Sequence, residues 1–343
     1  MPTNGKSFAL VTGAAGFLGA HTVRELVKRE EVSIVALDDL SGGFEENLVP
    51  EVPFVKGSVT DAELLAELFA KYRFRYIYHL AAYAAEGLSH FIRRFNYTNN
   101  LIGSVNLINA SVNQQPQVKR FVFLSSIAVY GDQEPPFLES RRITPMDPYG
   151  IAKYAVEMDL MAASRMWGLD YTVFRLHNVY GERQNVGDPY RNVIGIFMNK
   201  ILRGEPLPIF GDGQQIRAFT YIGDVAPVIA ASAEDRRAAN ETFNLGSDDT
   251  YGINVLAGRV AYAMTGSVDH EREYLPQREE AVRAFCDHTK AKVLLGAPCV
   301  TKLDDGLARM AAWVKQCGAR QSKPFEGIEV ERNLPPSWRK VIA

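Results

Sequence analysis

The sequence predicts an α/β protein built around a doubly wound parallel sheet, followed by a smaller C-terminal domain. Over the first 125 residues, short apolar runs alternate with amphipathic stretches of helical periodicity. Strands that helices cover on both faces are expected to be apolar throughout, and these runs have that character. After residue 178 the alternation stops, and residues 181–218 are rich in glycine and proline. This change of pattern predicts a second domain with many loops.

The expected elements follow one another along the chain in a simple order. Buried strands are predicted at residues 8–12, 32–37, 52–55, 76–80, 121–124, 171–176 and 242–245. A helix is predicted over residues 64–69, because Thr60 and Glu63 have the spacing of a capping box. Longer helices are predicted at about residues 91–112 and 149–167, and another near residues 193–203.

These elements divide the chain into two predicted domains and a tail. The doubly wound sheet takes residues 1–180, to which residues 219–249 return, and the smaller domain takes residues 181–218 and 250–318. Residues 319–343 hold three prolines and show little periodicity, so they are predicted to form a C-terminal tail that wraps over the protein or frays.

Composition excludes several classes of protein. A net charge of −2 and an isoelectric point near 6.3 leave no basic footprint for nucleic acid or for an anionic membrane. The three cysteines, Cys286, Cys299 and Cys317, have no CxxC spacing, so neither a disulfide framework nor a metal site is predicted. Because no signal region or long apolar run is present, we expect a cytoplasmic protein.

A glycine-rich turn follows the first predicted strand. Gly13, Gly16 and Gly19 have the spacing GxxGxxG, and such a turn lets a dinucleotide's diphosphate approach the N-terminus of the next helix. Asp38 ends the second strand, where a carboxylate accepts hydrogen bonds from the adenosine ribose and repels a 2′-phosphate. No Lys or Arg lies within residues 39–43, so the predicted cofactor is NAD rather than NADP. A plain tight turn and a helix-capping Asp38 are the alternatives.

Tyr149 and Lys153 are four residues apart, which places a phenol and an ammonium group on one face of a predicted helix. The pKa of a free tyrosine is about 10. We expect the nearby ammonium and a positive nicotinamide ring to lower it enough for Tyr149 to act as a base. Ser125 and Ser126 follow the strand at 121–124, at the carboxyl edge where doubly wound sheets bind ligands. A serine hydroxyl there can hydrogen bond a substrate oxygen.

Taken together, these motifs resemble the extended short-chain dehydrogenase/reductase family, and specifically its nucleotide-sugar 4-epimerases. The resemblance covers about residues 8–295 and implies a Rossmann-type fold for the larger domain. Its matching stretches occur in the order that the family has, at residues 12–19, 37–42, 79–82, 125–131, 149–153, 175–181 and 208–213.

The resemblance implies a role for each matching residue. The catalytic triad is Ser126, Tyr149 and Lys153. Contacts to NAD come from Gly13, Gly16, Phe17, Leu18, Asp38, Ser58, Val59, Leu80, Ala81, Ala82, Asn100, Tyr149 and Lys153. Contacts to a UDP-sugar come from Ser125, Ser126, Asn178, Arg217 and Arg278, the two arginines neutralising the diphosphate. The family further implies a homodimer joined by a four-helix bundle of the helices near 91–112 and 149–167.

Three positions depart from the pattern of the family. Ser58 and Ala218 stand where many relatives have Asp, and His177 replaces a common aromatic residue. The first departure puts a contact to adenine in doubt, and the other two lie near the sugar. A buried histidine with satisfied hydrogen bonds is the simpler interpretation of His177.

The residues after Ser126 indicate which reaction of the family is expected. Dehydratases, decarboxylases and 3,5-epimerases of the family place an acidic residue or a cysteine there, whereas Ile127 and Ala128 cannot move protons. The expected activity is therefore C4 epimerisation of a UDP-sugar, foremost UDP-glucose and UDP-galactose. The alternatives are a UDP-uronic acid or UDP-N-acetylhexosamine 4-epimerase, another nucleotide-sugar dehydrogenase or reductase, and a non-catalytic NAD-binding scaffold.

Overall fold

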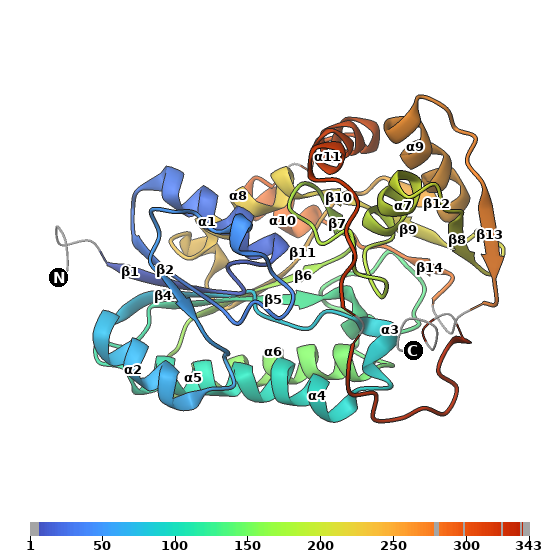
Figure 1. The fold of residues 1–343 in the computed structure, drawn as a ribbon. Coiled ribbons are helices and arrows are strands. Elements are labelled where there is room, and N and C mark those ends of the chain that lie inside the picture. The colour runs from blue at the N-terminus through green and yellow to red at the C-terminus, as the bar shows by residue number, and fades with distance from the viewer. Residues whose placement is uncertain (1–6, 278–280, 298, 324, 337, 339–343) are drawn as a thin grey trace.

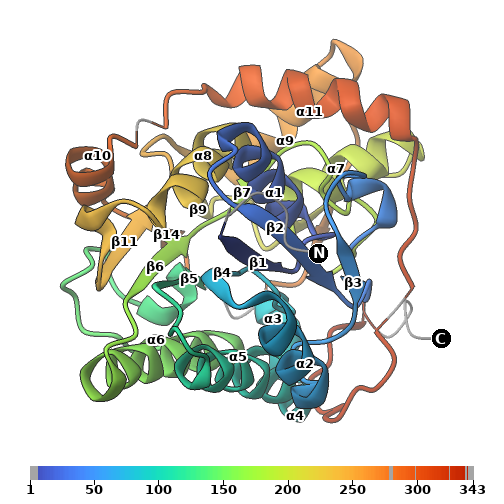
Figure 2. The same cartoon turned by 90° about the vertical axis from the view of Figure 1, so that its left-hand side faces the viewer.

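The computed structural model describes residues 7–277, 281–297, 299–323, 325–336 and 338. Its centre is a sheet of seven parallel strands in the order β11-β6-β5-β4-β1-β2-β3 (Figures 1 and 2). The strands are β1 (Phe8–Thr12), β2 (Ser33–Asp38), β3 (Phe54–Lys56), β4 (Phe74–His79), β5 (Arg120–Ser126), β6 (Tyr171–Leu176) and β11 (Glu241–Leu245). The chain leaves β1 toward β2 and β3, then returns to β4 on the other side of β1. The predicted doubly wound sheet is confirmed, and its switch point lies between β1 and β4.

The seven predicted strands all occur; β1 and β6 match at both ends, and the ends of the others differ by at most two residues. β3 begins at Phe54, two residues later than expected, and β5 runs on to Ser126. Side chains alternate along the strands as the two covered faces require. In β1, Ala9 and Val11 pack into the core on one face, whereas Leu10 packs into the core on the other.

Helices cover the two faces of the sheet, as Figures 1 and 2 show. One face carries α2 (Ala62–Tyr72), α4 (Arg93–Tyr97), α5 (Gly103–Asn113) and α6 (Pro148–Trp167). The other face carries α1 (Phe17–Arg29), α8 (Ile222–Ser232) and α10 (Thr289–Leu295). The predicted helix at 91–112 begins at Arg93 and contains a π-helical turn, Thr98–Ile102, between α4 and α5.

The predicted start of α2 is wrong in one detail. Asp61, not Thr60, caps the helix, because its carboxylate accepts a hydrogen bond of 3.0 Å from the backbone N–H of Leu64. The hydroxyl of Thr60 instead forms a hydrogen bond of 2.9 Å with the hydroxyl of Ser58. Both residue types cap helices well, so the sequence pattern alone did not separate them.

A second group of elements lies beyond the carboxyl ends of the strands (Figure 1). It contains the helices α7 (Val193–Leu202), α9 (Ile253–Thr265) and α11 (Leu303–Cys317). Its short strands pair as β7 (Val179–Tyr180) with β10 (Thr220–Tyr221), β8 (Leu207–Phe210) with β13 (Arg272–Leu275), and β9 (Ile216–Ala218) with both β12 (Thr250–Gly252) and β14 (Arg283–Ala284). These elements share a core that also includes Ile222 and Ala226 of α8. The predicted domain limits stay a prediction.

The C-terminal segment wraps over the protein. From α11 it runs past the second group of elements to the layer of α4, as both views show (Figures 1 and 2). Leu334 and Trp338 are buried there against Ala85, Leu88 and Ile92. Within the described residues, no helix has the length and apolar character that a membrane span requires.

Candidate active site

The glycine turn connects β1 to α1 and approaches the end of β4. Gly13 has a φ of +70°, and a Cβ there would lie 2.7 Å from the backbone nitrogen of Ala81, so only glycine fits. Gly16 is the N-cap residue of α1, and no side chain caps that helix. The N–H groups of the first turn, which begins with Phe17 and Leu18, are therefore available to an anion.

Asp38 ends β2 beside this turn and is only 8% exposed. Its Oδ2 accepts a hydrogen bond of 3.0 Å from the N–H of Ala15, and its Oδ1 accepts one of 2.7 Å from the N–H of Leu40. Burial raises the pKa of Asp38, and these backbone hydrogen bonds oppose the rise. Because Asp38 does not cap a helix, the alternative of a helix-capping carboxylate is wrong. The glycine cradle and this carboxylate fit the diphosphate and adenosine ribose of NAD.

The remaining residues predicted to contact NAD follow β4 and β3 or lie in the π-helical turn. Leu80, Ala81 and Ala82 follow β4, and the N–H groups of Leu80 and Ala81 donate to the backbone oxygen and the hydroxyl of Thr12, each at 3.2 Å. Ser58 and Val59 follow β3. Asn100 lies buried in the π-helical turn and fixes the backbone of Tyr83, accepting from its N–H at 2.8 Å and donating to its oxygen at 3.1 Å.

Ser126, Tyr149 and Lys153 come together at the carboxyl edge of the sheet. Tyr149 is the second residue of α6, and the side chain of Ser126 lies near enough to its hydroxyl to lower the pKa of Tyr149. Lys153 lies one turn further along α6, and its Nζ donates to the backbone oxygen of Leu124 at 2.7 Å. Tyr149 is 7% exposed and Lys153 is 3% exposed, so both groups are largely removed from water.

The electrostatics of Tyr149 differ from the sequence-based expectation. Burial raises the pKa of Tyr149, and the negative charges of Glu86 and Asp147 add to the rise. The side chain of Ser126 and the positive charge of Arg191 act in the opposite direction. Burial also lowers the pKa of Lys153 to about 7, against the charge of Glu157. In the polypeptide alone the pKa of Tyr149 is therefore raised, because desolvation is the largest effect. The predicted lowering by Lys153 together with a nicotinamide ring stays a prediction.

A buried ion pair beneath these residues was missed by the sequence reasoning. Glu157 accepts two hydrogen bonds from Arg175 of β6, at 3.1 Å from Nε and 2.6 Å from Nη2, and a third of 2.5 Å from the hydroxyl of Ser125. The Nη1 of Arg175 continues to the hydroxyl of Tyr130 at 2.8 Å. Ser125, predicted to contact the substrate, thus has its hydroxyl committed to Glu157. The available signal was the position of Glu157, four residues after Lys153 on the same face of α6.

Two of the residues predicted to bind the UDP-sugar, Asn178 and Arg217, have backbone oxygens as hydrogen-bond partners. The Nδ2 of Asn178 donates to the backbone oxygen of Ala218 at 3.0 Å. Arg217 donates to the backbone oxygens of Ile216, Ala281 and Val282, at 2.9, 2.6 and 3.1 Å. Arg278 lies outside the described residues.

A small hollow lies next to Asn178. It is lined by Asn178, Val179, Tyr180, Gln184, Asn192, Val193, Ile194 and Phe219. Asn192 is the N-cap residue of α7, and its side chain makes no capping hydrogen bond. The Oε1 of Gln184 is buried without a hydrogen-bond partner in the described chain. The sequence reasoning missed Asn192 and Gln184, although an Asn directly before an apolar helix was visible.

His177 is buried next to a second histidine. Its Nε2 lies 2.9 Å from the Nε2 of His288, and its Nδ1 lies 3.2 Å from the backbone oxygen of Ala218. His288 in turn reaches Asp248 at 2.7 Å. Burial lowers the pKa of His177 to about 3, and the structure therefore agrees with the simpler interpretation of a satisfied core histidine.

Comparison with known proteins yields consistent matches. The NAD dependent epimerase/dehydratase family matches residues 9–246. A putative UDP-glucose 4-epimerase of Methanocaldococcus jannaschii is 32% identical over 314 residues, covering 89% of this chain and 98% of the relative. The crystal structure of the Thermotoga maritima UDP-glucose 4-epimerase with UDP-glucose has a TM-score of 0.83 at 36% identity, covering 90% of this chain and 99% of that one.

A third matching protein was solved with a different UDP-sugar. The UDP-glucuronic acid 4-epimerase of Bacillus cereus, solved with UDP-glucuronic acid and NAD, has a TM-score of 0.82 at 26% identity, and covers 90% of this chain and 99% of that one. The chain is thus similar over most of its length to proteins named for different UDP-sugars.

Proposed function

The chain belongs to the NAD dependent epimerase/dehydratase family, and we propose that it is a C4 epimerase of a UDP-sugar, foremost UDP-glucose and UDP-galactose. One observation carries the proposal. Ser126, Tyr149 and Lys153 meet at the carboxyl edge of the sheet, the edge at which the glycine turn follows β1, while the turn after Ser126 begins with Ile127 and Ala128. Those side chains cannot move protons, so oxidation and re-reduction at one carbon is the chemistry that these residues support.

The residues around the glycine turn suit NAD as a retained cofactor. We assign the diphosphate to the turn at Gly13 and Gly16 and to the first turn of α1. Asp38 then holds the adenosine ribose, and Lys153 the nicotinamide ribose. The chemistry that NAD supplies when bound is acceptance of a hydride from the sugar and its return.

The polypeptide's part in the reaction is to move a proton and hold the sugar. Tyr149 takes the proton of the 4-hydroxyl group and gives it back after the 4-keto sugar has turned over. Ser126 hydrogen bonds to the same oxygen. Because burial raises the pKa of Tyr149, its ionisation needs positive charge nearby, which Lys153 and a nicotinamide ring provide.

The second group of elements offers a place for the nucleotide end of the substrate. Asn178, Asn192 and the N-terminus of α7 line the hollow, and backbone N–H groups at a helix start suit phosphate oxygens. We assign this hollow to the UDP group, with Arg217 beside it. An anchored diphosphate lets the sugar ring turn without leaving the site.

Relatives named for other UDP-sugars support a second candidate substrate. The Bacillus cereus protein was solved with UDP-glucuronic acid, so a UDP-uronic acid 4-epimerase is the next candidate. A panel of UDP-glucose, UDP-glucuronic acid and UDP-N-acetylglucosamine, followed by chromatography of the products, decides between them.

We also propose a homodimer, because apolar side chains remain exposed on the helices of one layer. Ile102 is 50% exposed, and Ile151 and Met158 of α6 are 41% and 45% exposed. A second copy of the same helices would cover them as a four-helix bundle. Light scattering at micromolar concentration tests this, and a monomeric mass would refute it.

The decisive experiment replaces Tyr149 by Phe. The variant keeps the aromatic ring and loses the ionisable oxygen, so NAD binding is retained while epimerisation falls about 10²–10⁴-fold. Tyr154→Phe, on the same helix, is the matched control and keeps wild-type activity. Interconversion of UDP-glucose and UDP-galactose is followed by chromatography, and a Tyr149→Phe variant within threefold of wild type would overturn the mechanism.

A further inference from the structure

Arg191 has an unusual set of partners for a largely buried guanidinium group. Its side chain is 19% exposed, and its Nε donates to Oδ2 of Asp188 at 2.6 Å. The guanidinium lies over the ring of Tyr83, 5.4 Å from the ring centre. The two terminal nitrogens have no hydrogen-bond partner among the residues that the structure describes. Four N–H groups are therefore available to a ligand.

These nitrogens lie beside the loop that covers the glycine turn. A Cβ on Gly42 would come within 3.3 Å of Nη2 of Arg191. The next residue, Gly43, lies so close to the turn that a Cβ there would be 2.6 Å from the backbone carbon of Ala15. On the other side, the positive charge of Arg191 acts on Tyr149. Arg191 thus lies beside the loop that packs on the glycine turn, and its charge also reaches Tyr149.

The C-terminal segment holds the residues that flank Arg191. The hydroxyl of Tyr190 accepts a hydrogen bond of 3.3 Å from the N–H of Phe325. The ring of Phe325 packs on Tyr83 with 5.3 Å between the ring centres, and Trp338 packs on Tyr190 at 5.4 Å. Side chains that are already fixed lose little entropy on binding, which favours binding by Arg191.

The glycine turn itself has no positively charged side chain that could neutralise a diphosphate bound there. The first turn of α1 contains no lysine or arginine. Lys153 donates to a backbone oxygen, and Arg217 has carbonyl oxygens as partners. A diphosphate carries two negative charges that backbone N–H groups compensate only in part, so a nearby guanidinium fork with free nitrogens complements it.

We propose that Arg191 is a further binding residue, and that its terminal nitrogens take diphosphate oxygens of a bound ligand. The diphosphate of NAD is the nearer source, because Arg191 lies beside the loop at Gly42. The diphosphate of the UDP-sugar is the other source of the same chemistry. The inference rests on the proposed function only for that second ligand, because NAD binding is a property of the family.

The test is Arg191→Gln in the full-length protein freed of nucleotide. Calorimetry measures the Kd of NAD and, separately, the Kd of UDP, with no turnover involved. NAD affinity is expected to fall about 10–100-fold, the loss typical of hydrogen bonds to charged groups. Arg191→Lys keeps the positive charge but lacks the planar guanidinium fork. Its affinity for NAD is expected to lie between those of Arg191→Gln and the wild type.

Two further variants control for the fold. Arg259→Gln is the matched control, because Arg259 also pairs with a carboxylate, Asp304, and lies 5.3 Å from the ring centre of Tyr251, but in the second group of elements. Asp188→Asn combined with Arg191→Gln repeats the measurement without leaving Asp188 as an unpaired charge.

The outcomes separate the ligands and the two proposals. A fall in UDP affinity alone assigns Arg191 to the diphosphate of the sugar nucleotide. Unchanged affinity for both NAD and UDP overturns the inference. Loss of NAD affinity in a protein that epimerises no UDP-sugar would count against the proposed function and leave the role of Arg191 standing.

Discussion

Charged side chains meet at both edges of the central sheet, but water reaches only one of the two groups freely. At the carboxyl edge, Glu157 and Arg175 pair beneath the candidate active site, with side chains 5% and 6% exposed. At the amino edge, Arg29 reaches Glu31 at 3.1 Å and Glu234 at 4.0 Å, with side chains 35%, 43% and 36% exposed. Similar residue types therefore meet in very different surroundings.

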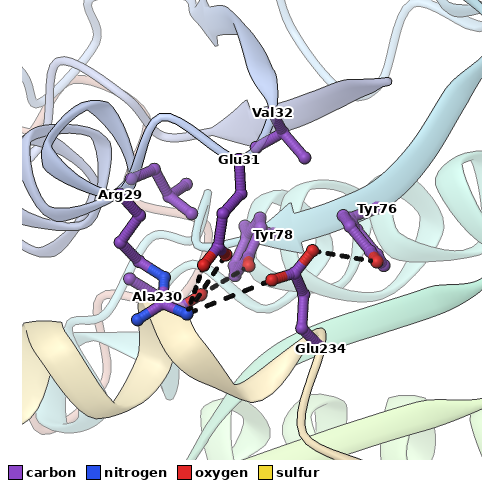
Figure 3. A pocket seen from close by; sticks show the side chains of 8 residues that line it. Arg29, Glu31, Val32, Tyr76, Tyr78, Ala230 and Glu234 are labelled. Carbon is purple, nitrogen blue, oxygen red and sulfur yellow. Dashed lines mark hydrogen bonds and ion pairs between the residues drawn. The ribbon is translucent and has the colours of Figure 1, made fainter. Parts of the chain in front are cut away.

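The group at the amino edge borders a shallow surface depression (Figure 3). The hydroxyl of Tyr76 donates to Glu234 at 3.3 Å, and the two glutamates are close enough to share a hydrogen bond. That contact raises the pKa of Glu234 and lowers the pKa of Glu31. Within the described chain, neither this nor any other group of three acidic, His or Cys side chains is arranged to hold a metal ion.

The difference teaches that burial, not the number of ion pairs, decides how much a pair of charges contributes to folding stability. Exposed pairs contribute about 0–1 kcal/mol, because water screens them and long side chains lose entropy. Breaking a buried pair costs about 3–5 kcal/mol, because the remaining charge has no solvent. Glu157, which Arg175 holds, also accepts the hydrogen bond of Ser125 next to Ser126, so the pair supports the geometry of the site.

The largest expected effect is on stability at the carboxyl edge. Arg175→Met leaves Glu157 buried without a cation and lowers the free energy of unfolding by about 3–5 kcal/mol. Glu157→Gln combined with Arg175→Met recovers part of the loss. Chemical denaturation measures both, and Arg29→Met at the amino edge is the control, with a loss below about 1 kcal/mol. Equal losses at the two edges would contradict the comparison.

The second prediction, of intermediate size, concerns the loss of folding stability at low pH. The pKa of His177 is about 3 in the folded protein, below its ordinary value of 6.5, so the unfolded chain binds the proton first as the pH falls. Folding stability is therefore lost from about pH 6.5 downward toward about pH 3. His177→Asn, which keeps a polar side chain, is expected to reduce the loss between pH 7 and pH 5 in thermal unfolding. An unchanged loss would show that other groups cause it.

The smallest effect is expected at the amino edge. Because the folded-state pKa of Glu234 is raised, the stability that its protonated form contributes is present at low pH and lost as the pH rises above the ordinary value of 4.5. Glu234→Gln removes this loss and changes stability at pH 7 by less than about 1 kcal/mol. Thermal unfolding of both proteins from pH 4 to pH 7 measures the difference. A steeper loss in the variant would show that the sign is wrong.

Much of the fold and part of the site follow from local rules that the sequence displays directly. Strand and helix periodicity locate β1, β2 and α6, and the carboxyl ends of parallel strands meet at one edge. The glycine turn follows such a strand, Asp38 and Ser126 end two others, and Tyr149 and Lys153 are one turn apart on one helix. Their meeting was therefore predictable without knowledge of any distant contact.

Tertiary structure alone decided the rest. Glu157 of α6 meets Arg175 of β6, and Arg191 meets Tyr83 under a C-terminal segment that has no periodic pattern. The pKa of Tyr149 is raised rather than lowered because segments distant in the sequence bury its hydroxyl. Desolvation depends on everything that packs around a group, and no spacing along the chain reports it. The sequence by itself determined which residues stand at the carboxyl edge, and packing determined which charges there remain available to a ligand.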